Sequence, residues 1–110
     1  MLKPTALAMS ERHWQIVQQI LQQYLADYDV WAFGSRTKAQ HKPYSDLDLV
    51  IKSDVVTPLK LQTQLTDAFE QSDLPWRVDI LDWASVSEHF QQIILQHYIV
   101  IQHAKKNDED

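Results

Sequence analysis

The chain has 110 residues, of which 45% are hydrophobic and 23% charged, a composition that suits a single folded domain over residues 1–110. It has no cysteine, which excludes a disulfide framework, a thiolate metal site and a cysteine nucleophile. A net charge of −5 argues against a broad nucleic-acid-binding surface. No apolar run is long enough to cross a membrane and no signal-peptide segment is evident, so we expect a cytoplasmic protein.

The chain begins with an arm and a helix. Residues 1–9 have no clear period and predict a loose N-terminal arm. Ser10 suits a helix N-cap, and residues 11–25 place apolar side chains on one face and glutamines on the other. Residues 29–33 then predict a strand that is buried on both faces, as in the centre of a sheet. The apolar residues of the helix are Trp14, Val17, Ile20, Leu21 and Tyr24.

The next stretch holds the residues with the clearest chemistry. Gly34 is the only glycine, and it stands at the end of a strand, directly before Ser35, where the backbone can turn sharply and approach a ligand. Residues 45–52 alternate as a strand does, which puts Asp46 and Asp48 on one face. Two carboxylates on one face repel each other unless a cation or a shared proton relieves them, and carboxylates suit Mg²⁺.

A helix and a third strand follow. Thr57 and Pro58 predict a helix start, with a capping hydroxyl and a proline at the first helical position. Residues 76–82 predict a strand in which Asp79 shares a face with Arg77. Asp82 falls on the opposite face at the strand's end, where a turn or capping role suits it better than a site role.

The C-terminal part predicts a helix, a strand and a tail. Ser85 and Glu88 have capping-box spacing before a helix, and residues 98–102 predict a last short strand. Residues 104–110 predict a charged, frayed tail. The order of elements predicts an α/β (α+β) domain with a small mixed sheet and helices mainly on one side. The expected core face of the last helix is Phe90, Ile93, Ile94 and His97.

Gly34-Ser35-Arg36 followed by Ser45-Asp46-Leu47-Asp48-Leu49 resembles the GS…DxD signature of the DNA polymerase β-like nucleotidyltransferase superfamily. At this length the chain is most similar to the minimal nucleotidyltransferases, which are found beside HEPN-domain proteins in prokaryotic toxin–antitoxin pairs. The resemblance runs from about Trp14 to about Gln102, and Asp79 matches the third acid of the superfamily. It implies a nucleotidyltransferase-like fold.

The resemblance also implies a reaction and a partner. Asp46, Asp48 and Asp79 would hold two Mg²⁺ ions, and Gly34, Ser35 and Arg36 would bind the phosphates of ATP. AMP would pass from ATP to a tyrosine of a partner HEPN ribonuclease toxin, which this chain would silence as its antitoxin in a hetero-oligomer.

These residues also have purely structural interpretations. A Gly-Ser pair after a strand can be an ordinary turn, and an alternating strand can carry solvated acids. Arg36 suits either a phosphate ligand or a solvated loop charge. Arg77 suits either a partner for a carboxylate on its own face or a contact to phosphate.

Three other functions compete with protein adenylylation. The chain could be a non-catalytic nucleotide-binding subunit that neutralises the toxin by contact, although intact acids would then carry an electrostatic cost without a purpose. It could be a small-molecule nucleotidyltransferase, although such enzymes usually carry an extra substrate-binding domain. The pattern Asp46-x-Asp48-x-Val50 also fits haloacid-dehalogenase-type phosphatases, but here it begins its strand instead of following one.

Overall fold

The computed structural model describes residues 2–38 and 45–105. The described helices are α1 (Glu11–Tyr24), α2 (Leu59–Glu70) and α3 (Glu88–Gln96), with short 3₁₀ turns η1 (Ser35–Thr37) and η2 (Trp83–Ser85). The strands are β1 (Asp29–Phe33), β2 (Leu47–Lys52), β3 (Val78–Asp82) and β4 (Tyr98–Gln102). Every helix and strand that the sequence predicts is therefore present, although β2 and β3 each begin two residues later than expected.

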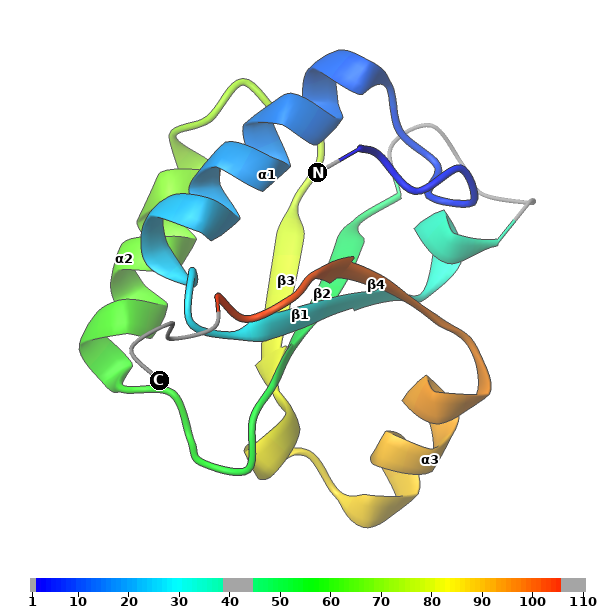
Figure 1. Ribbon diagram of the computed structural model, residues 1–110, viewed down its shortest axis with the longest axis vertical. Helices are drawn as coiled ribbons and strands as arrows, with labels where there is room; N and C mark the ends of the chain where they lie inside the picture. The colour runs from blue at the N-terminus through cyan, green and yellow to red at the C-terminus, as the bar shows by residue number, and fades with distance from the viewer. Residues whose placement is uncertain (1, 39–44, 106–110) are drawn as a thin grey trace.

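The strands form one mixed sheet in the order β3-β2-β1-β4 (Figure 1). β1 pairs antiparallel with both β2 and β4, whereas β2 and β3 run parallel. The two central strands are β1 and β2, which bracket the Gly34 stretch. The predicted small mixed sheet is confirmed, and it brings the end of β1 beside the start of β2.

One face of the sheet carries the main core, covered by α1 and α2. The side chain of Ser10 caps α1 by accepting a hydrogen bond from the His13 amide, as expected. Trp14, Val17 and Leu21 of α1 are buried against alternate residues of the strands, because residues two apart in a strand share a face. The strand residues in this core are Val30, Ala32, Leu47, Leu49, Ile51 and Ile101.

The opposite face is aromatic and only partly covered, by α3. Phe33 of β1 meets Phe90 of α3 edge to face, with ring centroids 6.0 Å apart. Trp31 stacks on Tyr98 of β4 at 4.1 Å. Ile94 of α3 is buried as expected, but Ile93 is 45% exposed and His97 lies at the surface, so the predicted core face of this helix is too wide.

Two predicted helix starts are wrong. Pro58, not Thr57, occupies the N-cap of α2, and the Thr57 hydroxyl donates to the Asp82 carboxylate. In α3 the cap is Ser87, which accepts from the Phe90 amide, while Ser85 ends the 3₁₀ turn η2. A serine or threonine caps a helix only when its hydroxyl oxygen accepts from an amide of the first turn, and local spacing alone does not decide that.

The expected loose arm is packed at its end nearer α1. Leu7 is buried in the core, and the Ala8 amide donates to the Arg36 carbonyl at 2.8 Å. At the other terminus the amides of Ala104 and Lys105 donate to Asp29 and Ala26, so the start of the expected frayed tail is held in place. Residues 106–110 of that tail lie outside the described residues.

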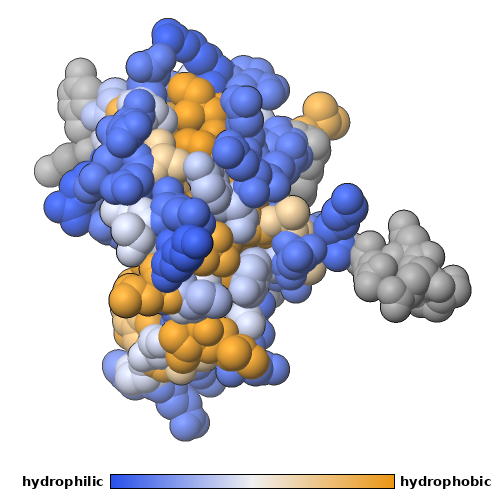
Figure 2. Space-filling model, turned by 90° about the vertical axis from the view of Figure 1, so that its left-hand side faces the viewer, coloured by the Kyte–Doolittle hydropathy of each residue, from blue (hydrophilic) through white to orange (hydrophobic). Residues whose placement is uncertain are grey.

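The face that carries α1 and α2 is mostly hydrophilic in its upper half, apart from an apolar area at the upper centre, and more apolar groups gather in its lower half (Figure 2). Val55, Val56 and Leu59, at the connection from β2 to α2, are 73%, 54% and 77% exposed. Within the described residues, no helix has the length and apolar character needed to span a membrane.

Candidate active site

Gly34 makes the sharp turn that ends β1, and its backbone conformation accepts only glycine. Its φ of 79° and ψ of −159° lie in a region that L side chains rarely adopt. A Cβ atom at this position would also overlap the Asp48 carboxylate. Glycine is therefore required twice over, once for the backbone angle and once for the closeness of the acid.

The turn that follows, Gly34–Thr37 (the Gly34 turn), is held from within and from α3. The Thr37 hydroxyl and amide both donate to the Gly34 carbonyl, at 2.6 and 3.1 Å. The His97 ring nitrogen Nε2 lies 2.6 Å from the Thr37 carbonyl. These contacts leave the Ser35 hydroxyl without a hydrogen bond to any residue that the structure describes. Neither Thr37 nor His97 was a predicted site residue, and His97 carries no local sequence signal because it is 60 residues away.

Asp48 and Asp79 lie side by side on the open end of the aromatic face. In the register of the sheet, Asp48 of β2 stands opposite Phe33 on one side and Asp79 on the other. Asp46 is exposed just before β2 begins. Partial burial raises the pKa of Asp48 to about 6, and the charges of Asp79 and Asp46 push it in the same direction. The charges of Asp46 and Asp79 therefore act on Asp48, and the three residues are here called the acid trio.

The third acid is held by an arginine. Arg77 donates to Asp79 Oδ1 at 3.0 Å, which realises the first of the two roles considered for Arg77. Within residues 2–38 and 45–105, no three acidic or histidine side chains stand ready as a ligand set for a metal ion. The chemistry of the donors still fits a hard cation, because Asp48 is partly buried among like charges that a cation would relieve.

The Arg36 side chain is buried and holds two backbone carbonyls in place. It is 3% exposed and donates to the Ser45 and Ala8 carbonyls, each at 2.8 Å. Its guanidinium also lies 4.2 Å above the Trp76 ring. Burial lowers the pKa of Arg36, and the Asp46 charge partly offsets this. The interpretation of Arg36 as a solvated loop charge is wrong, while its predicted contact with phosphate stays a prediction.

Asp82 stands apart from the acid trio, as the sequence indicates. It accepts hydrogen bonds from the Thr57 hydroxyl and amide and from Gln62 Nε2, the last at 2.7 Å. It therefore fixes the connection before α2. Of the basic loop residues, Lys38 is exposed, and His41 and Lys42 lie outside the described residues.

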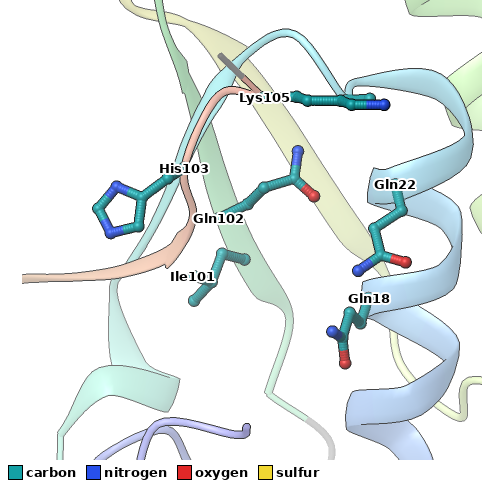
Figure 3. A pocket seen from close by; sticks show the side chains of 7 residues that line it. Gln18, Gln22, Ile101, Gln102, His103 and Lys105 are labelled. Carbon is teal, nitrogen blue, oxygen red and sulfur yellow. The ribbon is translucent and has the colours of Figure 1, made fainter. Parts of the chain in front are cut away.

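Two hollows are large enough to hold a small ligand or a peptide. One, of about 670 Å³, runs along β3 and contains Asp79. The other, of about 440 Å³, lies between α1 and the end of β4, where Gln18, Gln22 and Lys105 border it (Figure 3). No member of the acid trio lines the second hollow, so the first is the one associated with the candidate active site.

The comparisons with known proteins agree with this geometry. The nucleotidyltransferase domain family matches the chain over residues 10–106, which include the Gly34 turn and all three acids. The chain is also similar to the probable protein adenylyltransferase MntA of Haemophilus influenzae. The two are 54% identical over 94 residues, which cover 86% of this chain and 82% of that protein. The chain therefore belongs to the nucleotidyltransferase domain family, an enzyme family that is typically metal-dependent.

Proposed function

We propose that the chain transfers AMP from ATP to a tyrosine hydroxyl of a partner HEPN ribonuclease toxin and thereby acts as its antitoxin. The family match and the similarity to a probable protein adenylyltransferase support the transfer of AMP to a protein. The pair would form a hetero-oligomer in the cytoplasm.

One observation carries the proposal, and it is the contact between the Gly34 turn and Asp48. A phosphate-binding turn and a metal-binding acid must be close together if one triphosphate is to touch both. Here the turn comes so near that a single Cβ at Gly34 would overlap the carboxylate. An ordinary turn beside a solvated acid needs no such closeness.

The residues suggest a division of roles. Asp46, Asp48 and Asp79 would hold two Mg²⁺ ions, which would shield the phosphates and favour ionisation of the acceptor hydroxyl. Ser35 and the backbone of the Gly34 turn would bind the outer phosphates, and Arg36, which holds the Ser45 and Ala8 carbonyls, would fix the turn and add its positive charge near them. His97 would keep the turn in place through the Thr37 carbonyl.

The transfer itself exchanges one phosphorus–oxygen bond for another. The phenolic oxygen bonds to the α-phosphorus of ATP while the bond from that phosphorus to the α–β bridging oxygen breaks. Pyrophosphate leaves with the electron pair of the broken bond. The phenolic proton passes to the Asp79 carboxylate and from there to water.

The test is label transfer to the HEPN protein. With Mg²⁺ and ATP labelled at the α-phosphate, we expect covalent label on a HEPN tyrosine, located by mass spectrometry, and no label from γ-labelled ATP. Asp48→Asn should abolish labelling, whereas Asp67→Asn, at an exposed position of α2, should not. If the toxin is neutralised without label, the non-catalytic alternative is correct. If Asp48→Asn still labels, the assignment of the acids is wrong.

A further inference from the structure

The acceptor needs a place to bind, and the free edge of β3 offers one. We propose that an extended segment of the acceptor protein adds to β3 as a further strand and so delivers its tyrosine to Asp79. The proposal rests on the function proposed above and adds where, and in what conformation, the protein substrate is held.

The backbone of β3 has hydrogen-bonding groups to offer on its outer side. β3 is the last strand of the sheet within the described residues, and α2 runs near it (Figure 1). Leu47 donates its amide to the Arg77 carbonyl at 2.9 Å. In a parallel pair, alternate residues turn both backbone groups to the partner strand, so those of Arg77 and Asp79 face β2. The N–H and C=O groups of Val78 and Ile80 therefore point outward, ready to bond an added strand.

A groove accompanies this edge and has the size of a bound peptide segment. This β3 groove, of about 670 Å³, has β3 as one wall. The other wall is formed by Thr66 and Glu70 of α2 and by the loop at Leu74. Phe69 and Trp76 lie at its base, 6% and 8% exposed. Apolar side chains thus lie below the rim, and polar ones stand at the edges, as at peptide-binding sites.

Asp79 joins the groove to the acid trio. It lines the β3 groove and is also the register partner of Asp48. Successive side chains of an added strand would point to opposite faces of the sheet. A residue level with Asp79 would therefore point toward the acid trio, and its two neighbours in sequence would point toward Phe69 and Leu74. We infer an acceptor tyrosine with apolar residues immediately before and after it.

The charges of the edge favour a foreign chain over a second copy of this one. A second copy is disfavoured because each chain carries a net charge of −5, so two copies repel each other. The groove is lined by two acids, Glu70 and Asp79, and by one base, Arg77, and this excess of negative charge disfavours a nucleic acid there. An uncharged segment that carries a hydroxyl group is not repelled by these charges.

Amide hydrogen exchange tests docking separately from catalysis. The Asp48→Asn protein is mixed with the HEPN protein, and exchange at single amides is followed by NMR. We expect the Val78 and Ile80 amides to exchange at least tenfold more slowly in the complex, and the outward-facing edge of β4 to be unchanged. Unchanged exchange at Val78 and Ile80 would overturn the proposal. Protection without any label transfer by the unmodified chain would keep the docking site and refute the proposed function.

A pair of substitutions on α2 gives a second test. Thr66→Trp fills the β3 groove from its rim, whereas Gln64→Trp places the same side chain at an exposed position of the same helix that does not line the groove. We expect Thr66→Trp to raise KM for the HEPN protein at least tenfold, with the Kd of a fluorescent ATP analogue unchanged. Gln64→Trp should change neither quantity. Equal KM values for the two variants would overturn the proposal even if label transfer itself is observed.

Discussion

Gly34→Ala is the substitution that best tests the architecture of the site, because alanine adds one methyl group and nothing else. The backbone at Gly34 has φ 79° and ψ −159°, where a side chain costs about 1–3 kcal/mol. The new methyl would also overlap the Asp48 carboxylate. The overlapping oxygen is the end of a partly exposed side chain, so turning the carboxylate aside adds only about 0.5–1.5 kcal/mol, the cost of an off-rotamer side chain.

The two effects together predict a loss of about 1.5–4.5 kcal/mol, which is a large share of the roughly 5–15 kcal/mol that stabilises a typical domain. Urea unfolding at neutral pH should measure it as a lower transition midpoint with an unchanged slope. In protein that is still folded, a displaced Asp48 should lower label transfer by about 10²-fold, the effect of moving a reacting group by about 1 Å.

A double-mutant cycle separates backbone strain from overlap. In an Asp48→Ala background the overlapping atoms are gone, and the remaining Cβ of residue 48 lies 3.5 Å from the added methyl, an ordinary contact. Gly34→Ala should therefore cost about 1–3 kcal/mol there and more in the wild-type background. Equal costs in both backgrounds would refute the closeness of the turn and the acid. A cost below about 0.5 kcal/mol in the wild type would refute the backbone argument as well.

Three further substitutions have defined outcomes. Without metal, Asp48→Asn should stabilise the fold at pH 7.5 by about 1 kcal/mol, after the shift of the pKa to about 6 is discounted for partial exposure. Wild-type stability should fall as pH rises from about 4 to 6, because the folded chain keeps a proton that the unfolded chain releases, and Asp48→Asn should remove this slope. Thr57→Val should cost about 1–3 kcal/mol in urea unfolding, because it removes a buried donor to Asp82. Arg36→Lys should cost a similar amount and speed proteolysis near Ala8, whose carbonyl the guanidinium holds.

Each of these predictions has a matched control at an exposed position. Asp67→Asn on α2 should leave both stability and its pH dependence unchanged. Thr63→Val on α2 and Arg12→Lys on α1 should each change stability by less than about 0.5 kcal/mol. A destabilised Asp48→Asn protein would contradict the account of the acid trio. Equal losses in a test variant and its control would contradict the contact assigned to that test residue.

The parts of the structure that short-range pattern determines could be predicted from the sequence. Alternation in residues 45–52 predicted a strand with Asp48 facing away from Leu47 and Leu49, and β2 buries both leucines while Asp48 is half-buried. Asp46 lies just before the strand. The same argument separated Asp79 from Asp82, which the structure places in different surroundings. A lone glycine before Ser35 marked the turn, because φ near 79° has almost no other occupant.

What could not be predicted depends on partners far away in the chain. Thr57 has the local signature of a helix cap, but its hydroxyl donates a hydrogen bond to Asp82, 25 residues later. The sequence left two interpretations of Arg36, a phosphate ligand or a solvated charge. It gave no sign that the Ala8 carbonyl, 28 residues earlier, would accept a hydrogen bond from the guanidinium. Local pattern fixes which face a residue lies on, whereas tertiary contacts decide which neighbour it bonds.

The features that lower the stability of this fold lie together at the candidate active site. Gly34 has a backbone angle that favours glycine, and its turn lies against the Asp48 carboxylate. The pKa of Asp48 is also raised, by burial and by two neighbouring acids. A single change, Asp48→Asn, would relieve the electrostatic part of this strain while keeping the shape of the side chain. Strain of this kind persists where a function requires it, since most of a sequence agrees with its fold locally. The concentration of strain at Asp48 therefore favours a catalytic role over a vestigial nucleotide site. If Asp48→Asn is more stable than the wild type and also loses label transfer, the Asp48 charge is both costly to the fold and required for the reaction.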